Sequence, residues 1–366
     1  MKLFEVQSLL DMSLLNVAVS VCNGFEKFSP SKISKMKWLH DHWEACRKCR
    51  AKIVEIISRL RVPIKLENKL ASLIKHVYSE MIIWAGGLLQ MHSKILPQDK
   101  PACPCLDLID FRRSFQWKSV GIINEKETVL HLVSDERLDV AFRFVLACHF
   151  CLEKVVISLW GIMPEVTKSD IRLHTATQLE FVPFWITRLK EGVFSQYISS
   201  ELGAFIRLEQ AVFDYIALNV SALDYITHLF RDRKHYLYMV ACGSENPKVI
   251  RFCLRKTSEE YWKAIFDNNP KGVLLSLIDW PWQKHFMQFA PRVISFLGVP
   301  EFYCVMHRIL QKIQRLHHDF DYVELLKEFW ECSPTRFKES WRTAYKDEID
   351  LLKDILKDDY QFLGFH

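Results

Sequence analysis

The chain has 366 residues, of which 49% are apolar, 25% charged and 13% aromatic. This composition supplies a sizeable core and excludes a largely disordered protein. Its 11 glycines and 13 prolines are too few for the many short strands of a β-sandwich or barrel, so we expect an all-α fold. The 49 basic and 44 acidic residues give a net charge of +5, too balanced to indicate a polyanionic partner.

Residues 1–96 are predicted to form an N-terminal helical region. Glu5 and Asp11 interrupt the opening apolar stretch, which argues against a signal peptide, and no run is long enough to span a membrane. Residues 31–61 carry nine Lys or Arg and only three Asp or Glu. Such a basic segment can bind acidic protein, anionic lipid or nucleic acid, but it can equally be a solvated helix face. The candidate partner-binding residues in it are Lys35, Lys37, Arg47, Lys48 and Arg50.

Three prolines fall within residues 97–106, which predicts a linker between the N-terminal region and a helical repeat domain over 107–366. Cys103 and Cys105 flank one of these prolines, so we expect this pair to be exposed.

An internal repeat indicates how the helices are organised. Ala-Cys pairs at 45–46, 147–148 and 241–242 are each followed, seven residues after the alanine, by lysine and a β-branched pair. A looser version of the pattern begins at four further residues: Ala217, Ile265, Leu297 and Thr343. The pattern predicts a hairpin in which the small pair ends one helix and the apolar pairs line the inner face of the next. Because one hairpin cannot bury its apolar face alone, neighbouring hairpins are expected to stack into a solenoid.

In the central copy of this repeat, Val155, Val156 and Leu159 are expected to face the neighbouring unit. Lys154, which precedes them, is expected to face solvent.

The segments LACHFCLEKVVISLW (146–160) and VACGSENPKVIRFCL (240–254) resemble the ankyrin repeat, with its small pair, short turn and apolar pairs. Residues 128–132, TVLHL, are similar to the Thr-Pro-Leu-His with which a repeat of that family opens. The resemblance implies partner recognition without catalysis. The chain departs from the family pattern by carrying Cys148 and Cys242 at the second alanine, and Cys151 and Glu245 at the turn glycine. A generic α-solenoid or an irregular helical domain is the alternative fold.

The 11 cysteines are scattered along a long, well-cored chain, which is typical of reduced thiols in a cytoplasmic protein. Two Cys-x-x-Cys pairs occur, Cys46 with Cys49 and Cys148 with Cys151, and His40 and His42 could complete a zinc site at the first. Both pairs occupy the same register of the repeat, so we interpret the cysteines as packing residues. No metal or cofactor is expected.

Sequence motifs for phosphate, dinucleotide or nucleophile chemistry do not occur, since the chain has no Gly-x-Gly, Gly-Lys, His-Glu or Gly-x-Ser-x-Gly. No catalytic residue is therefore assigned. Trp280 and Trp282 flank a proline and are expected to remain partly exposed as anchors for a partner. The leading hypothesis is a non-catalytic protein–protein scaffold. The alternatives are a helical enzyme with a site assembled from scattered His, Cys and acidic residues, and nucleic-acid binding through residues 31–61.

Overall fold

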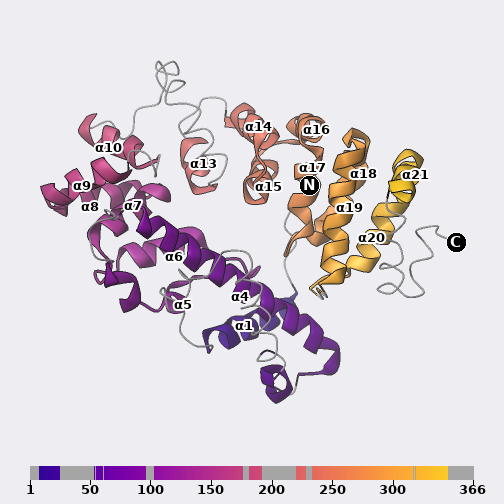
Figure 1. Cartoon of the computed structure of the whole chain (residues 1–366), viewed down its shortest axis with the longest axis horizontal. Helices are drawn as coiled ribbons and strands as arrows, with labels where there is room; N and C mark the ends of the chain where they lie inside the picture. Colours follow the sequence, from indigo (N-terminus) through magenta and orange to yellow (C-terminus); the bar gives the residue numbers. More distant parts are fainter. Residues whose placement is uncertain are drawn as a thin grey trace. The chain divides into compact units, whose positions relative to one another are not determined.

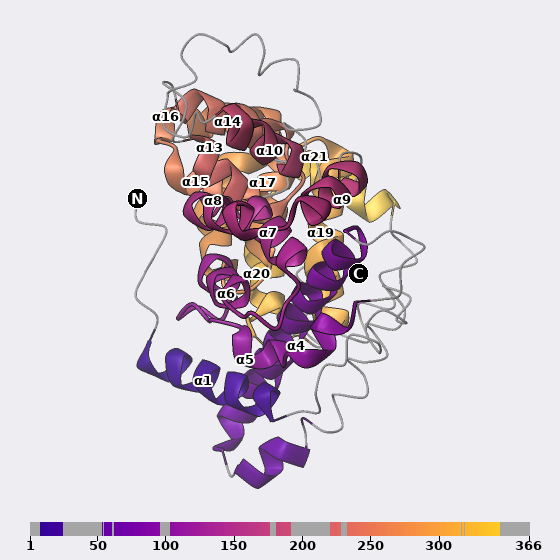
Figure 2. The same cartoon turned by 90° about the vertical axis from the view of Figure 1, so that its left-hand side faces the viewer.

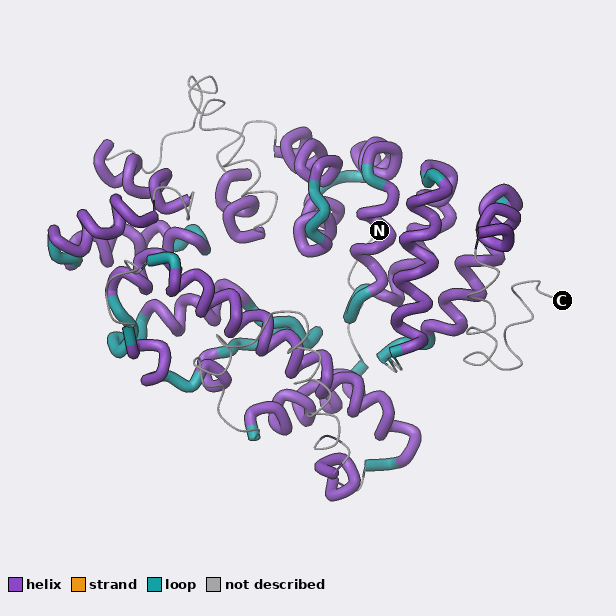
Figure 3. Tube along the Cα trace, in the orientation of Figure 1, coloured by secondary structure: helices purple, strands orange, loops and turns teal. Residues whose placement is uncertain are grey.

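The computed structural model describes residues 8–24, 53, 55–60, 62–95, 103–175, 181–191, 220–227, 233–315, 317 and 319–344 (Figure 1). Within these ranges the chain folds into helices and forms no strand, which confirms the all-α prediction (Figure 3). One isolated antiparallel bridge joins Trp117 to Ile123. The chain divides into two compact units, which comprise Val6–Arg231 and Asp232–His366. We call them the N-terminal unit and the C-terminal unit.

This division does not coincide with the linker expected at 97–106. Residues 97–102 lie outside the described part of the chain, but residues 104–108 form a short 3₁₀ helix, η1 (Pro104–Leu108), within the N-terminal unit. Cys105 and Leu106 on this helix are buried. The expectation that the Cys103/Cys105 pair is exposed is therefore wrong for Cys105, which is only 5% exposed, while Cys103 is half-buried.

The N-terminal unit contains the described helices up to α13. Their bounds are α1 (Leu9–Asn23), α4 (Ile64–Ser93), α5 (Phe111–Ser114), α6 (Glu125–Val133), α7 (Val140–His149), α8 (Glu153–Ile162), α9 (Glu165–Thr175), α10 (Phe181–Glu191) and α13 (Val220–Thr227). α1 begins at an N-cap, because the Ser8 side chain accepts a hydrogen bond from the backbone N–H of Asp11. α1 packs against α4 (Figure 2), and an ion pair of 2.7 Å between Asp11 and Lys69 joins the two helices.

The α7–α8 hairpin has the helix bounds that the repeat pattern predicts. α7 ends two residues after Ala147, and α8 begins six residues after it. The backbone N–H of Leu152 donates to the Ala147 carbonyl (2.9 Å), and that of Cys151 donates to the Cys148 carbonyl (3.1 Å). This pair of bonds is a Schellman motif, in which the residue after the C-cap adopts the left-handed conformation. Cys151 does so, with φ of 54°, although glycine is the residue that usually occupies this position.

The C-terminal unit contains a second hairpin with the same spacing. Its helices are α14 (Arg233–Gly243), α15 (Pro247–Lys256), α16 (Glu259–Asn268), α17 (Pro270–Ile278), η2 (Gln283–His285), α18 (Phe286–Val293), η3 (Ile294–Phe296), α19 (Val299–Gln314), α20 (Tyr322–Glu331) and α21 (Thr335–Ala344). α15 begins six residues after Ala241, as α8 does after Ala147. The turn between α14 and α15 differs from that between α7 and α8, because Glu245 has no positive φ and Asn246 caps the second helix.

The longer helices of the C-terminal unit pack in a regular order. α14 contacts α15 and α16, α15 contacts α17, α17 contacts α18 and α19, and α19 contacts α20 and α21. The core of this stretch is aromatic, and its fully buried rings include Phe266, Phe286, Phe289, Phe302, Phe329 and Trp341. Asn269, which precedes α17, donates from its amide to the carbonyls of Ala241 and Ser244, both at 2.8 Å. The start of α17 is therefore tied to the C-terminal end of α14.

Most of the predicted inner face of α8 is buried as expected. Val156 and Leu159 are buried and Lys154 is exposed, whereas Val155 is half-buried. Two other copies of the repeat pattern, those that begin at Ala45 and Ala217, start outside the described residues.

Candidate functional site

Trp280 and Trp282 lie in the turn between α17 and η2. Both are half-buried, which agrees with the expectation that they remain partly exposed. The Arg251 guanidinium of α15 lies over the Trp282 ring, 5.4 Å from its centroid, and donates a hydrogen bond of 2.6 Å to the Ser276 carbonyl of α17. Arg251 therefore connects α15, α17 and the turn. The hydrogen bond fixes the guanidinium, and the cation–π contact of the guanidinium then holds the Trp282 ring.

A buried polar network holds the residue that follows the turn. The Gln283 side chain donates to the Asp319 carboxylate (2.7 Å) and to the Tyr322 hydroxyl (2.9 Å), and this hydroxyl also donates to Asp319 (3.0 Å). Burial raises the pKa of Tyr322 above its usual range, so the phenol stays protonated and donates. Burial opposes ionisation of Asp319, but the hydrogen bond from His317 and the charge of Lys312 outweigh it and lower its pKa. A buried hydrogen-bond network of this kind rigidifies the elements it joins.

An ion-pair cluster fixes the other end of the turn. Asp279 lies 2.6 Å from the Lys312 ammonium and 3.2 Å from the Arg308 guanidinium, both on α19. Burial disfavours the Asp279 carboxylate, but the two cations outweigh burial and lower its pKa to about 2. The two indoles are thus presented on a turn anchored on both sides. Half-exposed aromatic side chains on a rigid support suit partner binding, because little conformational entropy is lost when they are covered.

The other candidate partner-binding residues cannot be placed. Lys35, Lys37, Arg47, Lys48 and Arg50 all lie outside the described residues, as do Cys46, Cys49, His40 and His42.

The second Cys-x-x-Cys pair lies at the end of α7. Cys148 is fully buried and Cys151 half-buried, and the Trp185 indole N–H donates to the Cys148 carbonyl at 3.0 Å. Burial raises the pKa of both thiols well above its usual value. Among the described residues, neither thiol belongs to a group of three potential metal ligands. The surroundings of this pair support the packing interpretation.

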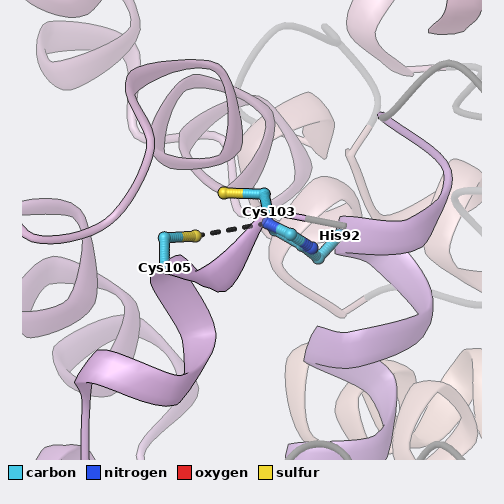
Figure 4. A group of neighbouring side chains, drawn as sticks. All are labelled: His92, Cys103 and Cys105. Atoms are coloured by element: carbon cyan, nitrogen blue, oxygen red, sulfur yellow. Dashed lines mark hydrogen bonds between the residues drawn. The ribbon is translucent and has the colours of Figure 1, made fainter. Parts of the chain in front are cut away.

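A different cluster, which sequence reasoning missed, brings together His92, Cys103 and Cys105 (Figure 4). His92 lies in the last turn of α4, Cys103 is the N-cap of η1, and Cys105 lies within η1. The His92 Nε2 atom is 3.3 Å from the Cys105 Sγ atom, and one potential ligand atom from each residue lies within 4.8 Å of the others. Burial lowers the pKa of His92, and burial raises that of Cys105 to about 12. The imidazole is therefore neutral and the Cys105 thiol is protonated near neutral pH.

A cavity of about 390 Å³ borders this cluster in the N-terminal unit. Cys103 and Cys105 line it, together with apolar residues and with charged residues of α7 and of the segment that leads into it, namely Glu136, Arg137, Asp139 and Arg143. The carboxylate of Asp139 caps α7 by accepting from the backbone N–H groups of Ala141 and Phe142. Both cysteines therefore border a cavity that is open to solvent, has a mixed polar and apolar lining, and can admit water.

No helix in the described ranges is long and apolar enough to cross a membrane. No known protein family, curated protein or solved structure matches this chain.

Proposed function

We propose that the chain is a non-catalytic protein-binding scaffold built from stacked helical hairpins. The observation that carries this proposal is the packing order of the C-terminal unit, where the longer helices contact the next helix and the next but one. Stacked hairpins produce this order, because each repeat contacts only its neighbours. Repeat arrays of this type present extended surfaces that commonly recognise other proteins, so the step from fold to function is one of analogy.

Two further features support stacking as the organising principle. The α7–α8 and α14–α15 hairpins share the same spacing between the small pair and the second helix. Asn269, at the start of α17, donates hydrogen bonds to the end of α14, although α15 and α16 lie between these two helices in the sequence. Such hydrogen bonds hold one hairpin against the next. Their acceptors are backbone carbonyls at the C-terminal end of a helix, which have no partner within the helix itself.

The surface that we assign to the partner lies at the Trp280–Trp282 turn and the neighbouring α15. Lys248, Arg251 and Arg255 lie on one face of α15 at spacings of three and four residues. α15 contains no acidic residue. Arg251 already touches Trp282. An indole pair beside a basic helix face is complementary to an acidic segment of a protein that also carries aliphatic side chains.

The proposal places the protein in a reducing compartment, the cytoplasm being the one we favour. The described cysteines are all free thiols, and free thiols are the rule in that compartment.

The test is quantitative affinity purification with the full chain, comparing the wild type with a Trp280→Ala/Trp282→Ala variant. The matched control is Trp160→Ala, which removes a half-buried tryptophan of α8 in the other unit. A partner anchored at a hot spot should lose about 2 kcal/mol, roughly a 30-fold weakening, in the double variant and keep its affinity in the control.

Circular dichroism and thermal melts must first establish that both variants fold. The proposal fails if the folded Trp280→Ala/Trp282→Ala variant retains every partner at unchanged affinity. It also fails if the wild type shows no saturable binding to any protein.

A further inference from the structure

We propose that His92, Cys103 and Cys105 form a zinc-binding site in the N-terminal unit, with a fourth coordination position open to the adjoining cavity (Figure 4). This site is separate from the Cys-x-x-Cys pairs that the sequence singles out, and it departs from the expectation that the chain binds no metal.

The ligand atoms are close to the positions that tetrahedral zinc requires. Zn–N bonds of about 2.0–2.1 Å and Zn–S bonds of about 2.3 Å imply N···S separations of about 3.6 Å and S···S separations of about 3.8 Å. The observed His92 Nε2 to Cys105 Sγ separation is 3.3 Å, and none of the three pairs exceeds 4.8 Å. The remaining gap to these separations is therefore at most about 1 Å for any pair of ligand atoms. One imidazole and two thiols also form a donor set that binds zinc in preference to magnesium or calcium.

The residues around the cluster fix the ligands in place. The Phe142 ring of α7 meets the His92 ring edge to face at 4.8 Å, which sets the orientation of the imidazole. The backbone of Asp139 favours the thiolate form of Cys105 and partly offsets the rise in the pKa of this thiol. The cluster thus draws on three segments, namely the end of α4, η1 and the start of α7. Neighbours that orient the ligands in this way are typical of metal sites in proteins.

The open position follows from the number of ligands and from the cavity. Three protein ligands leave one of four tetrahedral positions for water, the arrangement that distinguishes open zinc sites from closed structural ones. Cys103 and Cys105 both line the cavity of about 390 Å³, so water can reach an ion held between them. Zinc binding displaces the two thiol protons, because the thiolate is the ligand.

The experiment measures metal content and coordination in the full chain. The chain is expressed with zinc in the medium, purified without chelator and analysed by inductively coupled plasma mass spectrometry. To exclude a contribution from the first Cys-x-x-Cys pair, the measurement is made in a Cys46→Ser/Cys49→Ser background as well as in the wild type. We expect about one zinc per chain in both.

Adding Cys103→Ser/Cys105→Ser to that background should lower the zinc content at least about tenfold, because two of three protein ligands are lost. The matched control is Cys304→Ser, which removes an exposed thiol of the C-terminal unit and should leave the zinc content unchanged. X-ray absorption at the zinc edge of the Cys46→Ser/Cys49→Ser protein needs no variant of the site. It should detect two sulfur ligands and two lighter ones.

The proposal is overturned by a zinc content well below one per chain in the wild type. It is equally overturned by full zinc retention in folded Cys103→Ser/Cys105→Ser protein, by a disulfide between these cysteines under reducing conditions, or by a sulfur count other than two. A different metal at full occupancy would overturn the assignment to zinc.

Discussion

Truncating Leu159 tests the inner face of the α8 hairpin. Leu159 is 3% exposed in α8, and Leu159→Ala removes three carbons, which costs about 2.4 kcal/mol at about 0.8 kcal/mol per carbon. The cavity that remains adds to this loss, so we expect the free energy of unfolding to fall by about 2.5–4.5 kcal/mol. Ile157 on the same helix is 40% exposed, and Ile157→Ala should cost only about 1 kcal/mol. Lys154 is exposed, and Lys154→Ala should change stability by no more than about 0.5 kcal/mol.

Urea unfolding measures these costs, and hydrogen exchange with mass spectrometry locates them. The second measurement is needed because a chain of two units need not unfold in one step. The Leu159→Ala variant should lose exchange protection in α7 and α8, which pack against each other, while α17–α20 of the other unit keep theirs. The assignment of the buried face is refuted if Leu159→Ala is silent and Lys154→Ala is costly. Loss of protection spread evenly over both units would refute the locality of the damage.

Two further predictions concern a strained turn and a buried charge. Cys151 has φ of 54°, so Cys151→Gly should be more stable to urea than Cys151→Ala by about 1 kcal/mol, although both remove the thiol. Equal stability of these two variants would contradict the left-handed conformation. The pKa of Asp279 is lowered to about 2, so its ion pairs with Lys312 and Arg308 stabilise the fold above about pH 4, and this contribution is lost as the pH falls towards 2. The Asp279 side chain is 35% exposed, so we expect the free energy of unfolding to fall by about 1 kcal/mol. Thermal melts at acidic pH should detect this loss in the wild type but not in the Asp279→Asn variant.

The local hairpins could be predicted from sequence because their signals are short-range. An alanine-cysteine pair, a lysine and a β-branched pair fall within ten residues or so, and period and side-chain size are enough to place the turn and the buried face. The burial of Val156 and Leu159 and the exposure of Lys154 agree with that prediction. The partial exposure of Trp280 and Trp282 could be predicted for a related reason, since the proline between them interrupts the helical pattern.

The polar support of the tryptophan turn could not be predicted in this way. Gln283 meets Asp319 and Tyr322 across 36 and 39 residues of sequence, and no local pattern indicates such a pairing. The burial of Cys105 could not be predicted for a different reason. Prolines often mark an unpacked segment, but Pro104 is a favourable first residue for η1. The two residues after it are buried within the N-terminal unit.

The cysteines demonstrate why motif spacing alone does not identify a metal site. Cys148 and Cys151 have the spacing usually associated with zinc, but the described residues place no third ligand beside them, and the Trp185 indole binds the backbone there. Cys103 and Cys105 have a less familiar spacing, yet a buried imidazole lies within reach of both. Zinc affinity depends on how many donors converge on one point, and that number is set by the packing of α4 against the segment before α7. We therefore place the proposed zinc site at His92, Cys103 and Cys105 and not at Cys148 and Cys151.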